Sequence, residues 1–278
     1  MKALFDSSSL KCSKIITREY STSFSLGIQL FAPSIRPAIY AIYGFVRYAD
    51  EIVDSFNAYN QEELFREFVA DYRKALDRKI SLNPILNAFQ EIVLKYELQT
   101  YVDDFLKRME CDLYVTDYET DEAYKNYIYG SADVVGLMCL RVFVNNDDTQ
   151  FNKLKGSAKY LGSAFQKVNF LRDYKDDTEI LGRSYFPNVN KKGLTNLAKA
   201  DIIADIESDF AEAYKGIVQL PIESRLGVYL AYKYYLKLLH KIKRLDSKRL
   251  LSERIRISNP LKLFILTKAY IRFKLNVI

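Results

Sequence analysis

The chain has 278 residues, of which 49% are hydrophobic and 27% are charged, and its formal net charge is +6. This balance is typical of a globular protein that can bury a sizeable core. The three cysteines, Cys12, Cys111 and Cys139, share no metal-ligand spacing, and His240 is the single histidine. These counts exclude zinc sites, multi-histidine iron sites and disulfide frameworks; the cysteines are expected to be small core residues, and His240 to have a structural or surface role.

Helical periodicity runs through most of the chain, which contains only ten Gly and six Pro. Alternating strand-type runs are almost absent, so the predicted fold class is all-α. No segment reaches the ~18 uninterrupted apolar residues of a membrane span, and the N-terminus lacks the apolar region of a secretory signal, so a cytoplasmic protein is expected. Glycine-rich nucleotide loops are also missing, which removes the common nucleotide-binding classes.

The first informative stretch is a hydroxyl-rich patch, Ser21-Thr-Ser-Phe-Ser25, which precedes a helix predicted to begin near Pro37 and end near Asp54. Proline suits the first turn of a helix. Arg47, Asp50 and Asp54 follow one another at spacings of three and four, so they share one polar stripe beside the apolar face. Two carboxylates on one helix face could hold Mg²⁺ against a phosphorylated ligand.

The middle of the chain is predicted to be mainly scaffold. Residues 61–98 form one or two amphipathic helices interrupted near Asn83-Pro84, and residues 103–113 form an acidic helix. Residues 116–121 make a capping-rich turn that Asp117 and Asp121 serve. In residues 127–136, small residues interrupt an apolar helix, which indicates close packing, a kink or a ligand against the backbone.

A second polar stripe lies on the apolar helix predicted from Ser157 onward. Its members recur at spacings of three, four and four: Gln166, Asn169, Asp173 and Asp177. A buried hydrogen-bond network or a solvated edge would also produce such a stripe. However, buried carboxylates are costly without cations, and Arg47 and Arg172 cannot neutralise all of those on the two stripes, so the pair of stripes favours divalent metal.

The spacing of the aspartates is weak evidence by itself. The chain contains five pairs of Asp four residues apart, whereas chance alone would give roughly one or two. The pairs among Asp201, Asp205 and Asp209 are expected to be the solvated face of an ordinary amphipathic helix. Only the pairs that lie on arginine-bearing apolar helices are therefore candidates for chemistry.

Positive charge is concentrated in the C-terminal region. Residues 225–278 contain 14 Lys and Arg against two acidic residues, Asp246 and Glu253, which gives this region a net charge of +12. A solvated helix face, anionic lipid, nucleic acid and a diphosphate would each explain the charge. Apolar and basic residues alternate in residues 261–274, which favours a membrane surface, and no nucleic-acid-binding module is present.

Four ordered motifs resemble the squalene/phytoene synthase family, whose members join two prenyl diphosphates head to head. The motifs are Ser21-Thr-Ser-Phe-Ser25, Ala41-Ile-Tyr-Gly-Phe-Val-Arg-Tyr-Ala-Asp-Glu-Ile-Val-Asp54, Tyr127-Ile-Tyr-Gly-Ser-Ala132, and Gln166-Lys-Val-Asn-Phe-Leu-Arg-Asp-Tyr-Lys-Asp-Asp177 followed by Gly182-Arg-Ser-Tyr-Phe-Pro187. Glu51 departs mildly from the pattern, which commonly has Asp there. The resemblance implies one isoprenoid synthase domain over residues 1–278, all-α, with helices around a central cavity and the two aspartate-bearing helices facing each other across its mouth.

The resemblance also implies roles for individual residues. Mg²⁺ or Mn²⁺ would be held by Asp50, Asp54, Asp173, Asp177 and Asn169. The departing diphosphate would be stabilised by the metal and by Arg47, Arg172 and Arg183. The allylic cation would be sheltered by Phe24, Tyr43 and Phe165. The implied substrate-binding residues are Ser21, Ser23, Phe24, Tyr43, Tyr127, Gln166, Asn169, Arg183, Tyr235 and Arg254.

The expected reaction is condensation of two geranylgeranyl diphosphates to phytoene, through a cyclopropylcarbinyl diphosphate intermediate and without NADPH. This branch is favoured because residues 130–138 and 108–113 look more like phytoene synthases. Synthesis of squalene or dehydrosqualene from two farnesyl diphosphates is the alternative. A different class of protein, a non-catalytic helical membrane-associated assembly factor, is the rival, although loss of the aspartates would be its signature. The expected partners are the prenyl diphosphates, an anionic membrane at the inner face and a downstream desaturase, with no nucleic acid.

Overall fold

Helices make up the regular structure of this protein, as the periodicity predicts. The computed structural model describes residues 1–179, 182–187, 189, 193–250, 252 and 255–278. Within these ranges the only β interaction is an isolated bridge between Asp117 and Ser184. The helices are α1 Lys2–Tyr20, α2 Thr22–Gln29, α3 Arg36–Asp54, α4 Gln61–Arg78, α5 Pro84–Tyr96, α6 Gln99–Asp112, α7 Asp121–Ile128, the π-helical turn η1 Tyr129–Asp133, α8 Val134–Phe143, α9 Asp148–Arg172, α10 Tyr174–Glu179, α11 Asn196–Ile217, α12 Ile222–Arg244, α13 Ser247–Leu250 and α14 Asn259–Lys274.

Local capping signals account for several helix boundaries. Helix α3 has Pro37 in its first turn and ends at Asp54, as predicted. The predicted interruption at Asn83 separates α4 from α5, because the Asn83 side chain caps the first turn of α5. Thr120 caps α7, and Asp121 lies in the first turn, so the turn at residues 116–121 has the predicted capping role.

Helix α1 has no counterpart among the sequence predictions. It packs against α3 and α5 through a face that includes the small residues Ser9, Ser13 and Thr17, all fully buried. A Cβ atom on Gly44 of α3 would lie 3.2 Å from the Ser13 side chain, so the small residues allow α1 to approach α3 closely. The α1 stretch lacks a strong apolar stripe, because small hydroxyl residues fill its buried face.

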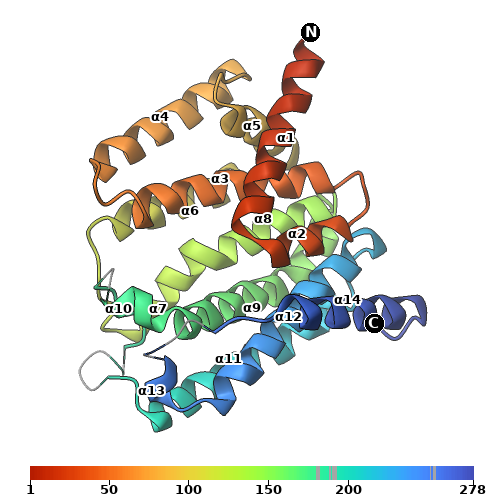
Figure 1. Cartoon of the computed structure of the whole chain (residues 1–278). Helices are drawn as coiled ribbons and strands as arrows, with labels where there is room; N and C mark the ends of the chain where they lie inside the picture. The colour runs from red at the N-terminus through yellow and green to blue at the C-terminus, as the bar shows by residue number, and fades with distance from the viewer. Residues whose placement is uncertain (180–181, 188, 190–192, 251, 253–254) are drawn as a thin grey trace.

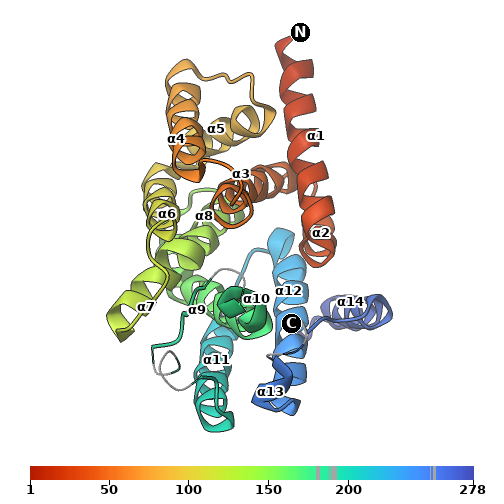
Figure 2. The same ribbon diagram turned by 60° about the vertical axis from the view of Figure 1, so that its left-hand side comes forward.

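Helix α9 runs through the middle of the molecule, where several other helices pack against it (Figure 1). It packs against η1 and α8 on one side and against α11 and α12 on others. Helices α1, α3, α4 and α5 form the N-terminal half of the structure, while α14 lies on the outer side of α12 (Figure 2). None of the described helices combines the length and the apolar character that crossing a membrane requires.

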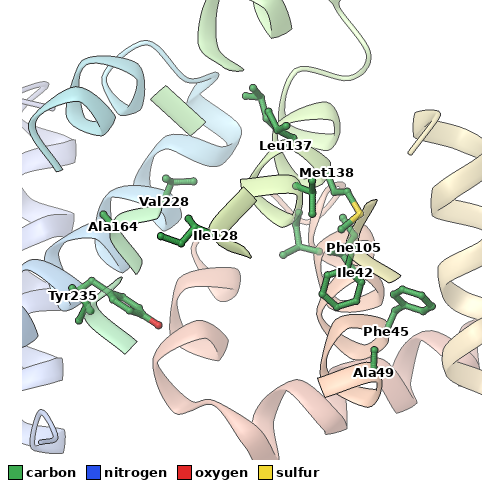
Figure 3. Packing of buried hydrophobic residues seen from close by; sticks show 14 of the residues in the cluster. Ile42, Phe45, Ala49, Phe105, Ile128, Leu137, Met138, Ala164, Val228 and Tyr235 are labelled. Atoms are coloured by element: carbon green, nitrogen blue, oxygen red, sulfur yellow. The ribbon is translucent and has the colours of Figure 1, made fainter. Parts of the chain in front are cut away.

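The buried hydrophobic residues form one continuous cluster between these helices. Figure 3 shows Ile42 and Phe45 of α3 beside Phe105 of α6 and Met138 of α8. The Phe45 ring stacks on Phe89 with 3.9 Å between the ring centroids. Aromatic residues therefore supply much of the core, as expected from a chain with 17 Phe and 22 Tyr.

Close packing explains the small residues in residues 127–136. The backbone there forms the π-helical turn η1, and a Cβ atom on Gly130 would lie 2.7 Å from the Arg108 side chain. A Cβ atom on Gly162 of α9 would lie 2.9 Å from the Ala132 carbonyl oxygen. The small residues thus allow η1 to pack closely against α6 and α9.

Two expectations about polar stripes need correction. The helix expected to carry both Asn169 and Asp177 is interrupted, because α9 ends at Arg172 and the Asp173 backbone has φ −100° and ψ 9°. The expectation that Asp201, Asp205 and Asp209 share a solvated face was wrong for Asp209, which is only 7% exposed. Its carboxylate accepts hydrogen bonds from Lys167 at 2.8 Å and from Ser163 at 2.7 Å.

The cysteines and the histidine lie largely where the sequence suggested. His240 is exposed on α12. Cys12 and Cys139 are partly buried and pack against the core, and all three cysteines are free thiols. Burial raises the pKa of the Cys139 thiol to about 12, so this residue is a small apolar side chain in practice.

Candidate active site

A cavity of about 460 Å³ lies between α2, α3, α8, α9, α11 and α12. Along α9 its wall extends from Leu154 to Arg172, which spans about 27 Å at a rise of about 1.5 Å per residue. The wall is mainly apolar, and the polar side chains gather toward the Arg172 end. The expectation of a central cavity enclosed by helices is therefore confirmed.

The two ends of the cavity differ in chemistry. At the end near Arg172, which is called the mouth here, the wall contains Tyr20, Ser21, Arg47, Asp50, Gln166, Asn169, Arg172 and Tyr235. At the opposite end, called the blind end, it contains Phe31, Leu140, Phe143, Leu154 and Leu220. A ligand with one anionic group and a long hydrocarbon tail matches this polarity.

The first aspartate motif lies on α3 at the mouth. Burial, and then the neighbouring Asp54 carboxylate, raise the pKa of the Asp50 carboxyl to about 7, although Arg47 acts in the opposite direction. The Arg47 guanidinium donates a hydrogen bond to Glu51 and lies 4.3 Å from the centroid of the Tyr20 ring. The negative charge of this motif is therefore greater than the Arg47 guanidinium neutralises.

The second motif lies at the end of α9 and in α10. The Arg172 Nε donates to Asp173 Oδ1 at 2.9 Å, and the Asp177 backbone N–H donates to the Asp173 carbonyl at 2.9 Å. Burial raises the pKa of Asp177 to about 7, and the charges of Asp173 and then Asp54 contribute in the same direction. Because Asp54 acts on Asp177, the fold brings together two motifs that lie 123 residues apart in the sequence.

Arg183 joins the two halves of the mouth. Its guanidinium donates to Asp54 Oδ1 at 2.5 Å and to the Asp112 carbonyl at 3.1 Å, and the residue is only 7% exposed. Its side chain lies beside the first motif but does not belong to the cavity wall, and its role toward the diphosphates stays a prediction. A buried arginine held between two chain segments also fixes their separation, so Arg183 stabilises the geometry of the mouth.

Asp112 is a residue that the sequence reasoning missed. It is buried at the end of α6, where Arg108 donates to its carboxylate at 2.7 Å and the Tyr118 hydroxyl donates at 3.0 Å. Burial raises the pKa of its carboxyl to about 6, against the effect of Arg108 and Arg183. The spacing of four between Arg108 and Asp112 was the available signal, but only the fold places this pair behind Arg183.

The donor set at the mouth fits a hard divalent cation. Among the residues that the structure describes, no three carboxylate, His or Cys groups converge as a complete metal cage. Mg²⁺ usually takes one or two carboxylates and completes its coordination with water and phosphate oxygens, so paired rather than clustered carboxylates suit it. The raised pKa values of Asp50 and Asp177 indicate negative charge that a cation would neutralise.

Aromatic rings line the cavity just inside the mouth. The Phe24 ring centroid lies 5.8 Å from that of Tyr43 and 6.4 Å from that of Phe165, and Phe165 stacks on Tyr235 at 3.9 Å. The Tyr235 hydroxyl donates to Asn169 Oδ1 at 3.2 Å, which connects the rings to the polar rim. Ring faces in this position can stabilise a positive charge formed beside the mouth.

The remaining candidate residues take different positions. Ser21 caps α2 by accepting a hydrogen bond from the Phe24 N–H, and it lines the mouth together with Gln166. Ser23 and Tyr127 do not belong to the cavity wall; Tyr127 packs in an aromatic cluster with Tyr118, Phe170 and Tyr185. Arg254 lies outside the described residues.

A helical enclosure with an acidic, arginine-bearing mouth and an apolar interior defines an isoprenoid synthase. The fold matches the crystal structure of a dehydrosqualene synthase in complex with ligand, with a TM-score of 0.82 and 21% identity over 97% of this chain and 98% of that one. It also matches a squalene synthase from Alicyclobacillus acidocaldarius, with a TM-score of 0.74 and 20% identity over 85% of this chain and 94% of that one. These likenesses confirm the predicted fold.

Sequence comparison defines the family. The squalene/phytoene synthase family model matches residues 17–260. Phytoene synthase 2 of Solanum lycopersicum is 29% identical over 94% of this chain and 89% of its own length, and the phytoene synthase of Pseudescherichia vulneris is 30% identical over 80% of this chain and 79% of its own length. The chain therefore belongs to the squalene/phytoene synthase family, and it is a prenyltransferase. Head-to-head joining of prenyl diphosphates is the class of reaction that these findings support.

Proposed function

We propose that this enzyme condenses two molecules of geranylgeranyl diphosphate to phytoene. The observation that carries the proposal is the polarity of the cavity, in which a wall about 27 Å long leads from an acidic and basic mouth to an apolar blind end. The similarity to phytoene synthases over most of the chain favours the twenty-carbon substrate. The fold likeness to dehydrosqualene and squalene synthases is compatible with either chain length.

Binding and ionisation of the diphosphate take place at the mouth. Asp50, Asp54, Asp173, Asp177 and Asn169 would hold Mg²⁺ or Mn²⁺, and the bound metal would neutralise the diphosphate and its developing charge. Arg47 and Arg172 line the mouth and donate to the diphosphate oxygens as the carbon–oxygen bond breaks. Arg183 keeps the two aspartate motifs at a fixed separation.

The hydrocarbon parts react inside the cavity. The rings of Phe24, Tyr43 and Phe165 stabilise the allylic cation and exclude water from it. The double bond of the second substrate attacks this cation, and loss of a proton from the resulting carbocation closes the cyclopropane ring of the cyclopropylcarbinyl diphosphate. Loss of its diphosphate, rearrangement and loss of a proton then give phytoene, without a reductant.

The purified protein, incubated with Mg²⁺ and geranylgeranyl diphosphate, is expected to release two diphosphates per phytoene formed, and NADPH should have no effect on the rate. Product identification by chromatography and mass spectrometry measures this outcome. Turnover of farnesyl diphosphate with no turnover of the geranylgeranyl substrate would exclude the twenty-carbon assignment and favour dehydrosqualene or squalene synthesis. A downstream desaturase is the partner class that would take phytoene onward.

Helix α14 is proposed to contact an anionic membrane. Its exposed side includes Leu263 and Phe264, each 64% exposed, together with Lys268 and Lys274. Residues 255–278 contain no Asp or Glu, so the helix presents apolar and basic groups without acidic ones. Such a surface fits anionic headgroups and the outer acyl region of a bilayer, where a forty-carbon hydrocarbon product would dissolve.

Liposome flotation tests this contact. Truncation after Asn259, or the charge reversal Lys268→Glu/Lys274→Glu, is expected to reduce binding to vesicles that contain phosphatidylserine by about thirtyfold or more, since each basic residue near such a surface contributes roughly 1 kcal/mol. Lys153→Glu/Lys155→Glu, on the exposed start of α9, has the same change in charge and should bind like the unmodified protein. Undiminished binding of the truncated protein would rule out α14 as the contact.

A further inference from the structure

The blind end of the cavity lies beside a second hollow of about 440 Å³, called the outer cleft here. The outer cleft is lined by Ile35, Tyr96, Val142 and Pro221 and by the polar residues Ser34, Lys95, Asn145, Gln150 and Glu223. Phe143, the last residue of α8, belongs to the lining of both the cavity and the outer cleft. Phe143 is therefore the residue at which the two hollows meet.

Phe143 is held in this position by a second aromatic ring. The Phe31 ring centroid lies 5.1 Å from that of Phe143, with 60° between the ring planes. Phe31 is itself confined, because a Cβ atom on Gly227 would lie only 2.3 Å from its ring. Phe31 and Leu220 are buried, so the partition is well packed on the cavity side.

The diphosphate end of the substrate is also held in a fixed place. Asp50, Asn169 and Arg172 locate the diphosphate at the mouth, and the helices that line the cavity set the distance from there to Phe143. A prenyl tail can extend only until its last carbon meets the partition. A rigid stop at a fixed distance from a charged anchor discriminates between chains that differ by one five-carbon unit.

We propose that Phe143, supported by Phe31, limits the length of the prenyl chain by closing the cavity against the outer cleft. The inference rests on the proposed function, in which a prenyl diphosphate lies with its charged group at the mouth. Removal of the Phe143 ring connects the cavity to the outer cleft and allows a longer tail to pass the position of the partition. Phe143 is thus a specificity residue that contacts the end of the tail.

Binding of unreactive thiolodiphosphate analogues provides the test. Farnesyl, geranylgeranyl and geranylfarnesyl analogues, with fifteen, twenty and twenty-five carbons, are titrated calorimetrically with Mg²⁺ into the full chain and into Phe143→Ala and Phe143→Leu. Phe143→Ala is expected to raise the affinity for the geranylfarnesyl analogue relative to the farnesyl analogue by about tenfold or more, because additional methylene and methyl groups become buried. Phe143→Leu, which is the safer variant for folding, should raise this ratio less.

A matched control is the neighbouring residue Val142, which lines only the outer cleft. Val142→Ala should leave the ratio of affinities unchanged. Turnover of geranylfarnesyl diphosphate by Phe143→Ala, absent from the unmodified enzyme, is the expected catalytic counterpart. An unchanged affinity ratio in both Phe143 variants, with helical circular dichroism retained, would overturn the inference.

The same titrations separate this inference from the proposed function. The analogue that the unmodified enzyme prefers, together with its turnover, tests the twenty-carbon assignment. The shift between the unmodified enzyme and the Phe143 variants tests the partition, whichever length is preferred. A fifteen-carbon preference that moves upward in Phe143→Ala would therefore overturn the substrate assignment and support the partition.

Discussion

Replacing Asp50 or Asp173 with Asn is expected to reduce turnover roughly 10³-fold or more while the helical fold is retained. Each substitution removes one negative charge and one metal-binding oxygen from a motif whose carboxylates are proposed to hold the cations that stabilise the diphosphate. The fold should survive, because the native carboxylates at the mouth repel one another and the neutral amide relieves that repulsion. Product formation and far-ultraviolet circular dichroism measure the two effects.

Asp201→Asn is the matched control for these variants. Asp201 belongs to an Asp pair with the same spacing of four, but it is exposed on α11, away from the cavity wall. Its replacement should leave turnover within a factor of about two. More than a tenth of the normal turnover in either Asp50→Asn or Asp173→Asn would contradict the proposed metal site.

The Lys167→Met variant is expected to lose about 3–5 kcal/mol of unfolding free energy, because the substitution leaves the buried Asp209 carboxylate without its cation. Lys167 Nζ lies 2.8 Å from Asp209 and also contacts Asp205, and the Lys167 and Asp209 side chains are each 9% exposed. The pair joins α9 to α11, and neither residue belongs to the cavity wall. Urea denaturation followed by circular dichroism measures the loss.

Two further variants test whether burial of the Lys167–Asp209 pair is the reason for the expected loss of stability. Lys243→Met removes the cation from the exposed Lys243–Glu207 pair, which should cost no more than about 1 kcal/mol. Lys167→Met combined with Asp209→Leu removes both buried charges and should recover much of the lost stability. Equal losses for Lys167→Met and Lys243→Met would show that Asp209 is solvated in solution.

The site was predictable where its signals are local. Arg47, Asp50 and Asp54 lie on one helix face because of their spacing, and Phe24, Tyr43 and Phe165 were correctly expected near one another. The motifs that resemble the family implied that both aspartate pairs share one mouth. Spacing and motif order are properties of the chain itself, so sequence reasoning reads them directly.

Other features depend on segments that are distant in the sequence. Asp209 looks like a solvated residue until α9 brings Lys167 against it, from 42 residues away. Asp112 is connected to the first aspartate motif only because Arg183, 71 residues away, donates to both Asp54 and the Asp112 carbonyl. The periodicity of a helix shows which residues share a face, but the neighbour that covers this face is decided by tertiary packing.

The sequence by itself determined the all-α class, the family, several helix boundaries and the aspartate, arginine and aromatic candidates, because these follow from periodicity, capping and motif order. Only the tertiary structure decided that Asp209 is buried, that Arg183 bridges the mouth and that Phe143 closes the cavity. Those features arise from contacts between helices, and the volume enclosed by helices depends on how side chains from several of them pack together.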